Sequence, residues 1–133
     1  MICKLEKEDY NKIIELANLV KNGFTLNEIG PNDEMFAYIE NGEIWGFITC
    51  SRMYETLDIL YIAVDVNHRR QGIARKLVEY ISKFDQIERI MLEVRVDNIG
   101  AIAFYKTMGF ELVRIIKNYY DGVDALSLER KLK

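Results

Sequence analysis

Residues 60–77, LYIAVDVNHRRQGIARKL, constrain the fold of this 133-residue chain more than any other stretch. They begin as an apolar run, which favours a strand, and the run breaks at Asp65. Apolar residues then recur at helical spacing, so a helix is expected from Gln71 to about Phe84. A strand, a turn at Gly72 and a helix start bring together unpaired backbone N–H groups and the positive end of a helix dipole. The stretch therefore predicts an anion site, and phosphate is the expected ligand.

The turn reads Arg69-Arg70-Gln71-Gly72-Ile73-Ala74-Arg75, an R-x-x-G-x-A pattern. It is neither a Walker loop nor a dinucleotide loop, because Gly72 is the only glycine between Gly46 and Gly100. The pattern resembles the pyrophosphate loop of the GNAT N-acetyltransferases, usually Q/R-x-x-G-x-G/A. The alternative interpretation is that Gly72 only lets a strand turn into a helix and that the arginines beside it are solvated.

The remaining residues alternate strand and helix patterns. A helix is expected from Tyr10 until Gly23, and a loop over 24–33 could border a substrate cleft. A second helix pattern covers 99–108, and strands are expected over 2–5, 35–39, 44–50, 56–64, 90–96, 110–117 and 125–130, with hairpin turns at 41–42 and 121–122. This order predicts an α+β domain with a mixed sheet and a parallel crossover between 56–64 and 90–96.

Composition limits the functional classes. Half of the residues are hydrophobic and the chain has one proline, so a single globular domain over 1–133 is expected. The net charge of −3 argues against nucleic acid as the main partner and suits a positively charged acceptor. No signal peptide or long apolar span is recognisable, so no membrane segment and a cytoplasmic location are expected.

Cysteine and histidine are scarce. Cys3 and Cys50 lie in apolar, strand-like segments and are interpreted as reduced, buried structural thiols. His68 is the single histidine, so the chain offers few residues for a metal site or a Ser/His/Asp triad. Metal-free chemistry is therefore expected. His68 is interpreted as solvated or close to a phosphate of the ligand.

The second half of the chain extends the resemblance. It reads L-E-V-R-x-x-N-x-x-A-I-x-x-Y-x-x-x-G-F from Leu92 to Phe110, and continues through Asn118-Tyr119-Tyr120 to Asp124-Ala125. This pattern is similar to the RimI type of GNAT enzymes, which acetylate protein N-termini. The resemblance implies a GNAT fold, with a mixed central sheet and helices on both faces, and acetyl-CoA as cosubstrate.

The resemblance also implies roles for individual residues. Glu93 would be the general base that acts on the amine through water, and Tyr105 the general acid that protonates the departing CoA sulfur. Tyr119 and Tyr120 would line the acceptor slot. Acetyl-CoA would contact Ile62, Ala63, Val64, Arg69, Arg70, Gln71, Gly72, Ile73, Ala74, Arg75 and Asn98.

Each of these residues also has a purely structural interpretation. Asn98 would cap a helix, Tyr105 would be a core aromatic residue, and Tyr119 and Tyr120 would be ordinary strand residues. Glu93 would form an ion pair with Arg95 on the same face of a strand. Asn98 and Tyr105 are two turns apart on one predicted helix, about 10 Å along the same face, so both could reach one bound molecule.

The acceptor is expected to be a protein or peptide α-amino group. Glu93 is the only carboxylate in the motif, and a weak base suits an α-amine of pKa about 8 better than a lysine of about 10.4. RimI-type enzymes carry more residues in the region of 24–33, so ribosomal protein as the substrate is not implied. A small amine or lysine as acceptor, and a non-catalytic acyl-CoA-binding module, are the alternatives, with a monomer or homodimer as the assembly.

Overall fold

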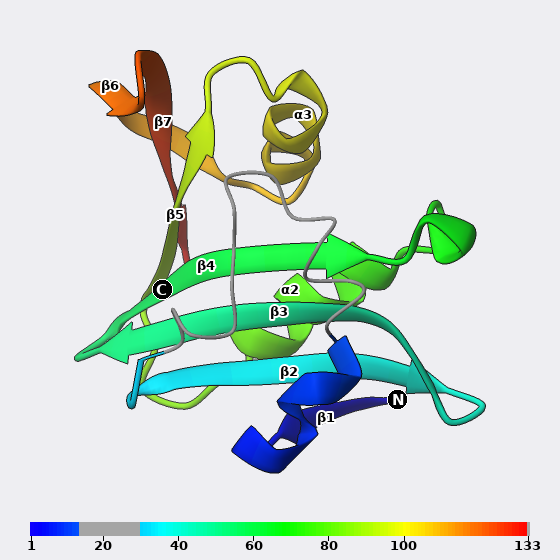
Figure 1. The fold of residues 1–133 in the computed structure, drawn as a ribbon. Helices are drawn as coiled ribbons and strands as arrows, with labels where there is room; N and C mark the ends of the chain where they lie inside the picture. Colours follow the sequence, from blue (N-terminus) through cyan, green and yellow to red (C-terminus); the bar gives the residue numbers. More distant parts are fainter. Residues whose placement is uncertain (14–29, 133) are drawn as a thin grey trace.

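The computed structural model describes residues 1–13 and 30–132, which contain one seven-stranded sheet (Figure 1). The strand order is β1-β2-β3-β4-β5-β7-β6. The strands are β1 (Ile2–Leu5), β2 (Asp33–Glu40), β3 (Glu43–Met53), β4 (Thr56–Val64), β5 (Arg89–Arg95), β6 (Glu111–Tyr120) and β7 (Val123–Lys131). Neighbouring strands are antiparallel except β4 and β5, which are parallel, so the mixed sheet and the crossover are confirmed.

The described residues contain two 3₁₀ helices and two α-helices, and the α-helices are slightly shorter than the sequence pattern suggested. The 3₁₀ helices are η1 (Lys7–Ile13) and η3 (Val66–His68), and the α-helices are α2 (Ile73–Ser82) and α3 (Ile99–Thr107). The helix predicted from Tyr10 is a 3₁₀ helix in its described part and begins three residues earlier, at Lys7. In its first turn, the Asp9 N–H donates to the Glu6 carbonyl at 2.8 Å. The rest of that prediction, and most of the predicted loop over 24–33, lie outside the described residues.

Helices cover both faces of the β1–β4 half of the sheet. In Figure 1, α2 lies behind β2, β3 and β4, whereas η1 lies in front of the sheet beside β1 and β2. The amphipathic pattern of α2 explains its position, because Ile73, Leu77, Val78 and Ile81 are all buried in the core on that side. A smaller cluster on the front consists of Leu5, Ile13, Met35, Ala37 and Phe47. The expected helices on both faces are confirmed.

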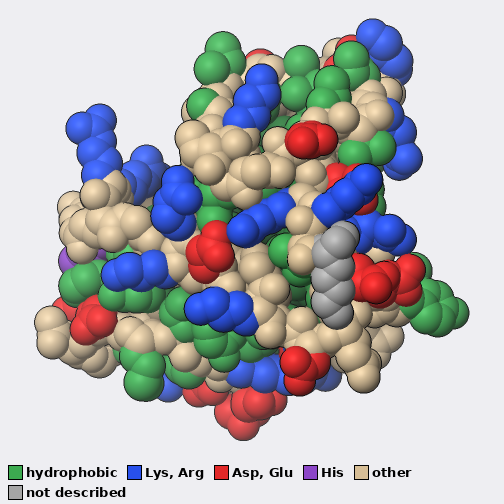
Figure 2. Space-filling model, turned by 180° about the vertical axis from the view of Figure 1, so that it is seen from behind, with side chains coloured by type: hydrophobic (Ala, Val, Ile, Leu, Met, Phe, Trp, Pro, Cys, Tyr) green, Lys and Arg blue, Asp and Glu red, His purple; other side chains and the backbone are tan. Residues whose placement is uncertain are grey.

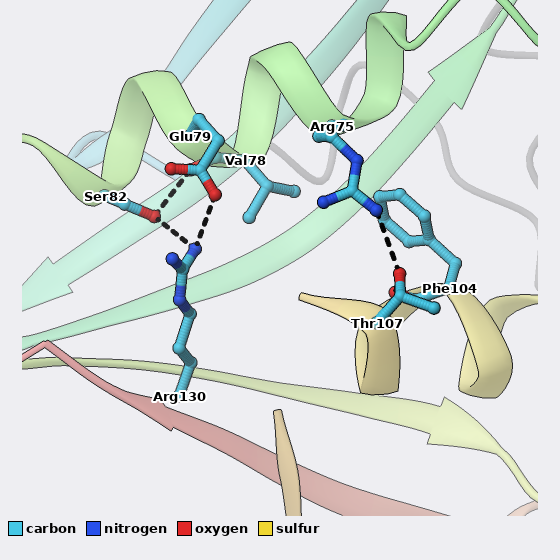
Figure 3. A network of polar contacts seen from close by, with 7 residues as sticks. All are labelled: Arg75, Val78, Glu79, Ser82, Phe104, Thr107 and Arg130. Atoms are coloured by element: carbon cyan, nitrogen blue, oxygen red, sulfur yellow. Dashed lines mark hydrogen bonds and ion pairs between the residues drawn. The ribbon is translucent and has the colours of Figure 1, made fainter. Parts of the chain in front are cut away.

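Polar side chains connect α2 to its neighbours (Figure 3). The Arg75 guanidinium donates to the Thr107 hydroxyl at 3.1 Å, which links α2 to α3. The Arg130 guanidinium, from β7, donates to the Glu79 carboxylate at 3.1 Å and to the Ser82 hydroxyl at 3.2 Å. Basic and acidic side chains are interspersed over this rear face (Figure 2). Because none of these contacts is fully buried, they orient the elements more than they stabilise them.

The sheet opens between β4 and β5. These two strands pair only from Thr56 to Asp58 on β4 and from Arg89 to Met91 on β5, and beyond that point they diverge (Figure 1). A register shift between β3 and β4 leaves Leu60 without a pairing partner, as in a β-bulge. The backbone of β4 after Asp58 therefore faces the opening instead of β5.

In the described part of the chain, no helix is long and apolar enough to span a membrane.

Candidate active site

Two adjoining clefts lie beside β4. The larger is in the opening between β4 and β5, and the smaller is between the end of β4, the loop before α2 and helix α3. The larger has a volume of about 710 Å³ and the smaller about 580 Å³. Both are lined by Ile62, Val64, Arg69, Ala101 and Tyr105. Because the two clefts share these walls, a molecule held in the smaller cleft can extend into the larger one.

The smaller cleft contains the predicted phosphate loop. Gly72 is the N-cap of α2 and has φ of 76°, a left-handed conformation that favours glycine. No heavy atom lies within 4 Å of where a Cβ on Gly72 would be, so the space beside the helix N-terminus is open. The first N–H groups of an α-helix have no partner inside the helix, and an anion in this space would accept their hydrogen bonds.

Most of the predicted loop residues line this cleft. They are Arg69, Arg70, Gly72, Ile73, Ala74 and Arg75. Ile62 and Val64 of β4 line both clefts, and Ala63 lines the larger one. Gln71 is exposed and lines neither cleft, so its side chain does not contribute to the walls. The His68 ring also lines the smaller cleft and stacks on Trp45, with ring centroids 3.8 Å apart.

Tyr105 lies at the junction of the two clefts. Its ring is 5% exposed and packs edge to face on Phe104 and Phe110, at centroid distances of 5.1 and 5.2 Å. Within the described residues, its hydroxyl has no hydrogen-bond partner. Burial raises the pKa of Tyr105 well above its usual value of 10, so the hydroxyl is protonated at neutral pH. The interpretation of Tyr105 as a core aromatic residue is confirmed, and its role as the general acid stays a prediction.

Asn98 caps α3 and lines the larger cleft. Its side-chain oxygen accepts the Ala101 N–H at 3.2 Å, so the predicted helix cap is confirmed. The cap uses only the side-chain oxygen of Asn98, so the N–H groups of its side-chain amide take no part in the cap. Asn98 and Tyr105 do line one cleft, as their spacing on the helix predicted.

Glu93 lines the larger cleft from β5. Leu92 and Val94 are buried on the opposite face, so the alternation predicted for this strand is confirmed. The alternative ion pair with Arg95 is wrong, because the Arg95 guanidinium pairs with Asp97 at 3.0 Å. Burial raises the pKa of Glu93, the negative charge of Asp58 raises it further, and Arg114 opposes both effects.

Tyr119 and Tyr120 form the part of the larger cleft contributed by β6. Their rings meet edge to face, with centroids 4.8 Å apart. The Tyr120 hydroxyl donates to the backbone carbonyl of Glu93 at 3.4 Å, which connects β6 to the strand that carries the predicted base. Burial raises the pKa of Tyr120 to about 12.

Sequence reasoning missed several residues of the larger cleft. Asp58, Tyr61 and Arg95 also line it. Asp58 gave the same signal as Glu93, a carboxylate between apolar strand residues, but it belongs to no recognised motif. Among the described residues, no group of three or more His, Cys, Asp and Glu side chains could hold a metal ion.

The two cysteines are not part of the cleft walls. Cys50 is fully buried, and burial raises the pKa of its thiol to about 12, which is consistent with a structural, unreactive role. Cys3 is half-buried, so its predicted burial is only partial.

Known proteins share this sequence and fold. The model of the acetyltransferase (GNAT) family matches residues 1–110. The ribosomal protein bS18-alanine N-acetyltransferase of Escherichia coli K12 is 34% identical over 94 residues, 67% of this chain and 62% of that protein. The enzyme of the same name from Haemophilus ducreyi is 32% identical over 132 residues, 93% of this chain and 91% of its own length. The crystal structure of the Escherichia coli ribosomal-protein-S18-alanine N-acetyltransferase superposes with a TM-score of 0.87 at 26% identity, covering 100% of this chain and 94% of that one.

The chain belongs to the GNAT acetyltransferase family. Its similarity to the alanine N-acetyltransferases confirms the RimI-like resemblance read from residues 92–125. The matched region spans less than two thirds of the Escherichia coli relative, so that relative's substrate is not transferred to this chain by similarity alone.

Proposed function

We propose that this acetyltransferase moves the acetyl group of acetyl-CoA to a primary amine, and that the acceptor is the α-amino group of a protein or peptide. One observation carries the proposal: the cleft with the phosphate loop and the cleft with the carboxylates meet at Tyr105. A donor and an acceptor that enter from different sides would meet at this protonated hydroxyl. Both clefts are built on one sheet, which supports a single catalytic domain over 1–133.

Acetyl-CoA fits the smaller cleft and the adjoining edge of β4. Its pyrophosphate would accept hydrogen bonds from the N-terminal N–H groups of α2, beside the open space at Gly72. Its pantetheine arm carries amides, and an extended chain of amides can pair with a free strand edge as an added strand does. The β4 backbone after Asp58 offers such an edge, because β5 has diverged from it.

Glu93 is suited to receive the proton of the acceptor. An ammonium must lose a proton before its nitrogen can attack a carbonyl, and a raised carboxyl pKa makes Glu93 a better base than an unperturbed glutamate. The remaining question is which group protonates the leaving sulfur. Tyr105 is the candidate, because it lines both clefts and burial keeps it protonated.

The proposed reaction balances as follows. The ammonium gives one proton to Glu93, through water, and the neutral nitrogen forms a bond to the thioester carbonyl carbon. The carbon–sulfur bond then breaks, and the sulfur takes the proton of the Tyr105 hydroxyl. The proton that the acylated nitrogen still has to lose restores Tyr105 through solvent, and Glu93 releases its proton to solvent. The products are therefore an amide, the free thiol and one proton. A backbone N–H of β4 is the proposed donor to the developing oxyanion.

An α-amino acceptor is supported by the relatives and by the walls of the larger cleft. The similar enzymes are named for an alanine N-terminus, and Tyr119 and Tyr120 supply aromatic walls against which the first residues of a peptide could pack. Asn98 remains a proposed contact of acetyl-CoA, through the part of its amide that the helix cap does not use.

The test uses a peptide that has a free N-terminal alanine and one internal lysine. With acetyl-CoA, we expect CoA release, and mass spectrometry of the fragments should place the acetyl group on the N-terminus. Glu93→Gln and Tyr105→Phe should both slow the reaction. Predominant acetylation of the lysine would contradict the α-amino assignment, and no CoA release with any peptide or small amine would contradict the activity itself.

A further inference from the structure

Asp58 and Glu93 project into the same cleft from neighbouring strands. Asp58 pairs in parallel register with Met91, and Glu93 lies two residues further along β5 on the same face. Regular strand spacing and rise would put the Cα atoms of Asp58 and Glu93 about 8 Å apart, and the divergence of the two strands beyond Met91 makes this a lower bound. Both carboxylates line the larger cleft, so one small cation in that cleft can contact both.

Neither carboxylate is neutralised by an ion pair within the described residues. The nearby arginines have other partners, since Arg95 pairs with Asp97 and Arg89 pairs with Glu55. Arg114 on β6 is exposed and lowers the pKa of Glu93 less than burial and Asp58 raise it. The cleft therefore holds two carboxylates whose charges are not compensated by an ion pair.

This arrangement is unfavourable for the folded protein without a ligand. Burial raises the pKa of Asp58, and burial together with Asp58 raises the pKa of Glu93. A carboxyl group whose pKa is raised by folding destabilises the fold once the pH is above that pKa. Asp58 is half-buried and Glu93 is exposed to the cleft. Carboxylates in a cleft whose pKa values are raised in this way are typical of sites that serve binding or catalysis.

We propose that Asp58 is a second acceptor-binding carboxylate, which holds the ammonium group of the acceptor beside Glu93 before proton transfer. This inference rests on the proposed acetyl transfer and adds a residue and a charge requirement to it. The ammonium donates one hydrogen bond to Asp58 and one toward Glu93, and only the proton on the Glu93 side is transferred. Cationic amines are therefore captured from solution in their abundant, protonated form.

Asp58 also contributes, after burial, to the raised pKa of the base Glu93. The titratable or charged groups that act on Glu93 are Asp58 from β4 and Arg114 from β6, and Tyr120 from β6 lies next to its backbone. When Asp58 is replaced by a neutral residue, the largest charge effect that raises the pKa of Glu93 is lost. The pH at which Glu93 becomes a carboxylate should then move down.

The experiment compares Asp58→Asn with wild type and with Asp85→Asn. Asp85 is exposed in the turn between α2 and β5 and lines neither cleft, so its variant has the same change in net charge without a change in the site. For Asp58→Asn, we expect the KM of the amine to rise roughly 10- to 100-fold, as for loss of a hydrogen bond to a charged group. The KM of acetyl-CoA should stay the same, and the acidic limb of kcat/KM should shift to lower pH.

Stability measurements separate binding from a structural role. Asp58→Asn should unfold at the same or a higher temperature than wild type at neutral pH, because it removes a charge that opposes folding. Asp58→Glu should recover part of the amine affinity. An active wild type whose amine KM and pH profile are equal in Asp58→Asn and Asp85→Asn would overturn this inference alone. An inactive wild type would instead overturn the proposed function.

Discussion

Replacing Tyr105 by phenylalanine tests the proposed acid by deleting one oxygen atom. The aromatic contacts with Phe104 and Phe110 involve the ring, which phenylalanine keeps. The hydroxyl has no hydrogen-bond partner among the described residues, so no buried partner is left unsatisfied. The free energy of unfolding should therefore change by less than about 1 kcal/mol. Deleting the whole ring, as in Tyr105→Ala, should cost about 3–5 kcal/mol.

Catalysis should respond much more strongly. Burial raises the pKa of Tyr105, which keeps the proton on the oxygen at neutral pH and also makes the hydroxyl a weaker acid. The same apolar surroundings also raise the pKa of a thiol. The departing sulfur therefore becomes a better proton acceptor, which offsets the weaker acidity of the Tyr105 hydroxyl. A positioned acid contributes a hundredfold or more, which is about 2.7 kcal/mol of transition-state stabilisation.

The assay is the single-turnover rate of acetyl transfer, because product release limits kcat in many enzymes. Calorimetry should show that Tyr105→Phe binds acetyl-CoA as wild type does. Tyr80→Phe is the matched control, since Tyr80 lies on α2 outside both clefts and loses the same hydroxyl. A single-turnover rate of Tyr105→Phe within a few fold of wild type would refute the proposed role.

Three further predictions concern the loop, the base and the sheet. Gly72→Glu should abolish acetyl-CoA binding in calorimetry, because a carboxylate would enter the open space at which the anion binds. Gly72→Ala should retain binding, and its free energy of unfolding should fall by about 1 kcal/mol because of the left-handed backbone. Glu93→Gln should remove the acidic limb of the rate profile, which in wild type should lie above the usual pKa of 4.5, and a profile that keeps this limb would exclude Glu93 as the base. Gly46→Ala should lower the free energy of unfolding by about 1–3 kcal/mol in denaturant titrations, because its Cβ would lie 3.0 Å from both the Ala63 carbonyl and an Ile73 methyl group.

The elements whose sequence signals are local were predicted well. Asn41-Gly42 has positive φ at both residues, 53° and 77°, and joins β2 to β3 as the hairpin signal indicated. Asp121-Gly122, with φ of 43° and 92°, joins β6 to β7 in the same way. The helix from Gln71 begins two residues later than expected, because the left-handed Gly72 occupies the N-cap position.

The clefts could not be predicted in this way, since they depend on where two distant strands stop pairing. No residue pattern marks Asp58 and Met91 as the last pair of β4 and β5. The position of β7 between β5 and β6 is likewise decided by packing and not by chain order. For the same reason, only the structure places Asp58 on the cleft face beside Glu93.

Asp58 changes the argument about the acceptor. With Glu93 as the only carboxylate in the motif, the sequence favoured an α-amine as the acceptor. The pKa of an α-amine is about 2.4 units below that of lysine, so its deprotonation costs roughly 3.3 kcal/mol less. A second carboxylate that raises the pKa of Glu93 makes it a stronger base and reduces that advantage.

The preference for the α-amine then depends mainly on the aromatic walls of the cleft. It should become stronger in a variant in which the pKa of Glu93 is lower, because Glu93 is then a weaker base. In the competition with the peptide that has both amines, we therefore expect Asp58→Asn to lower lysine acetylation more than N-terminal acetylation, because the less acidic ammonium depends more on base strength. The measured ratio of N-terminal to lysine product should rise above that of wild type and of Asp85→Asn. A ratio that stays equal or falls would show that Asp58 does not act through the basicity of Glu93.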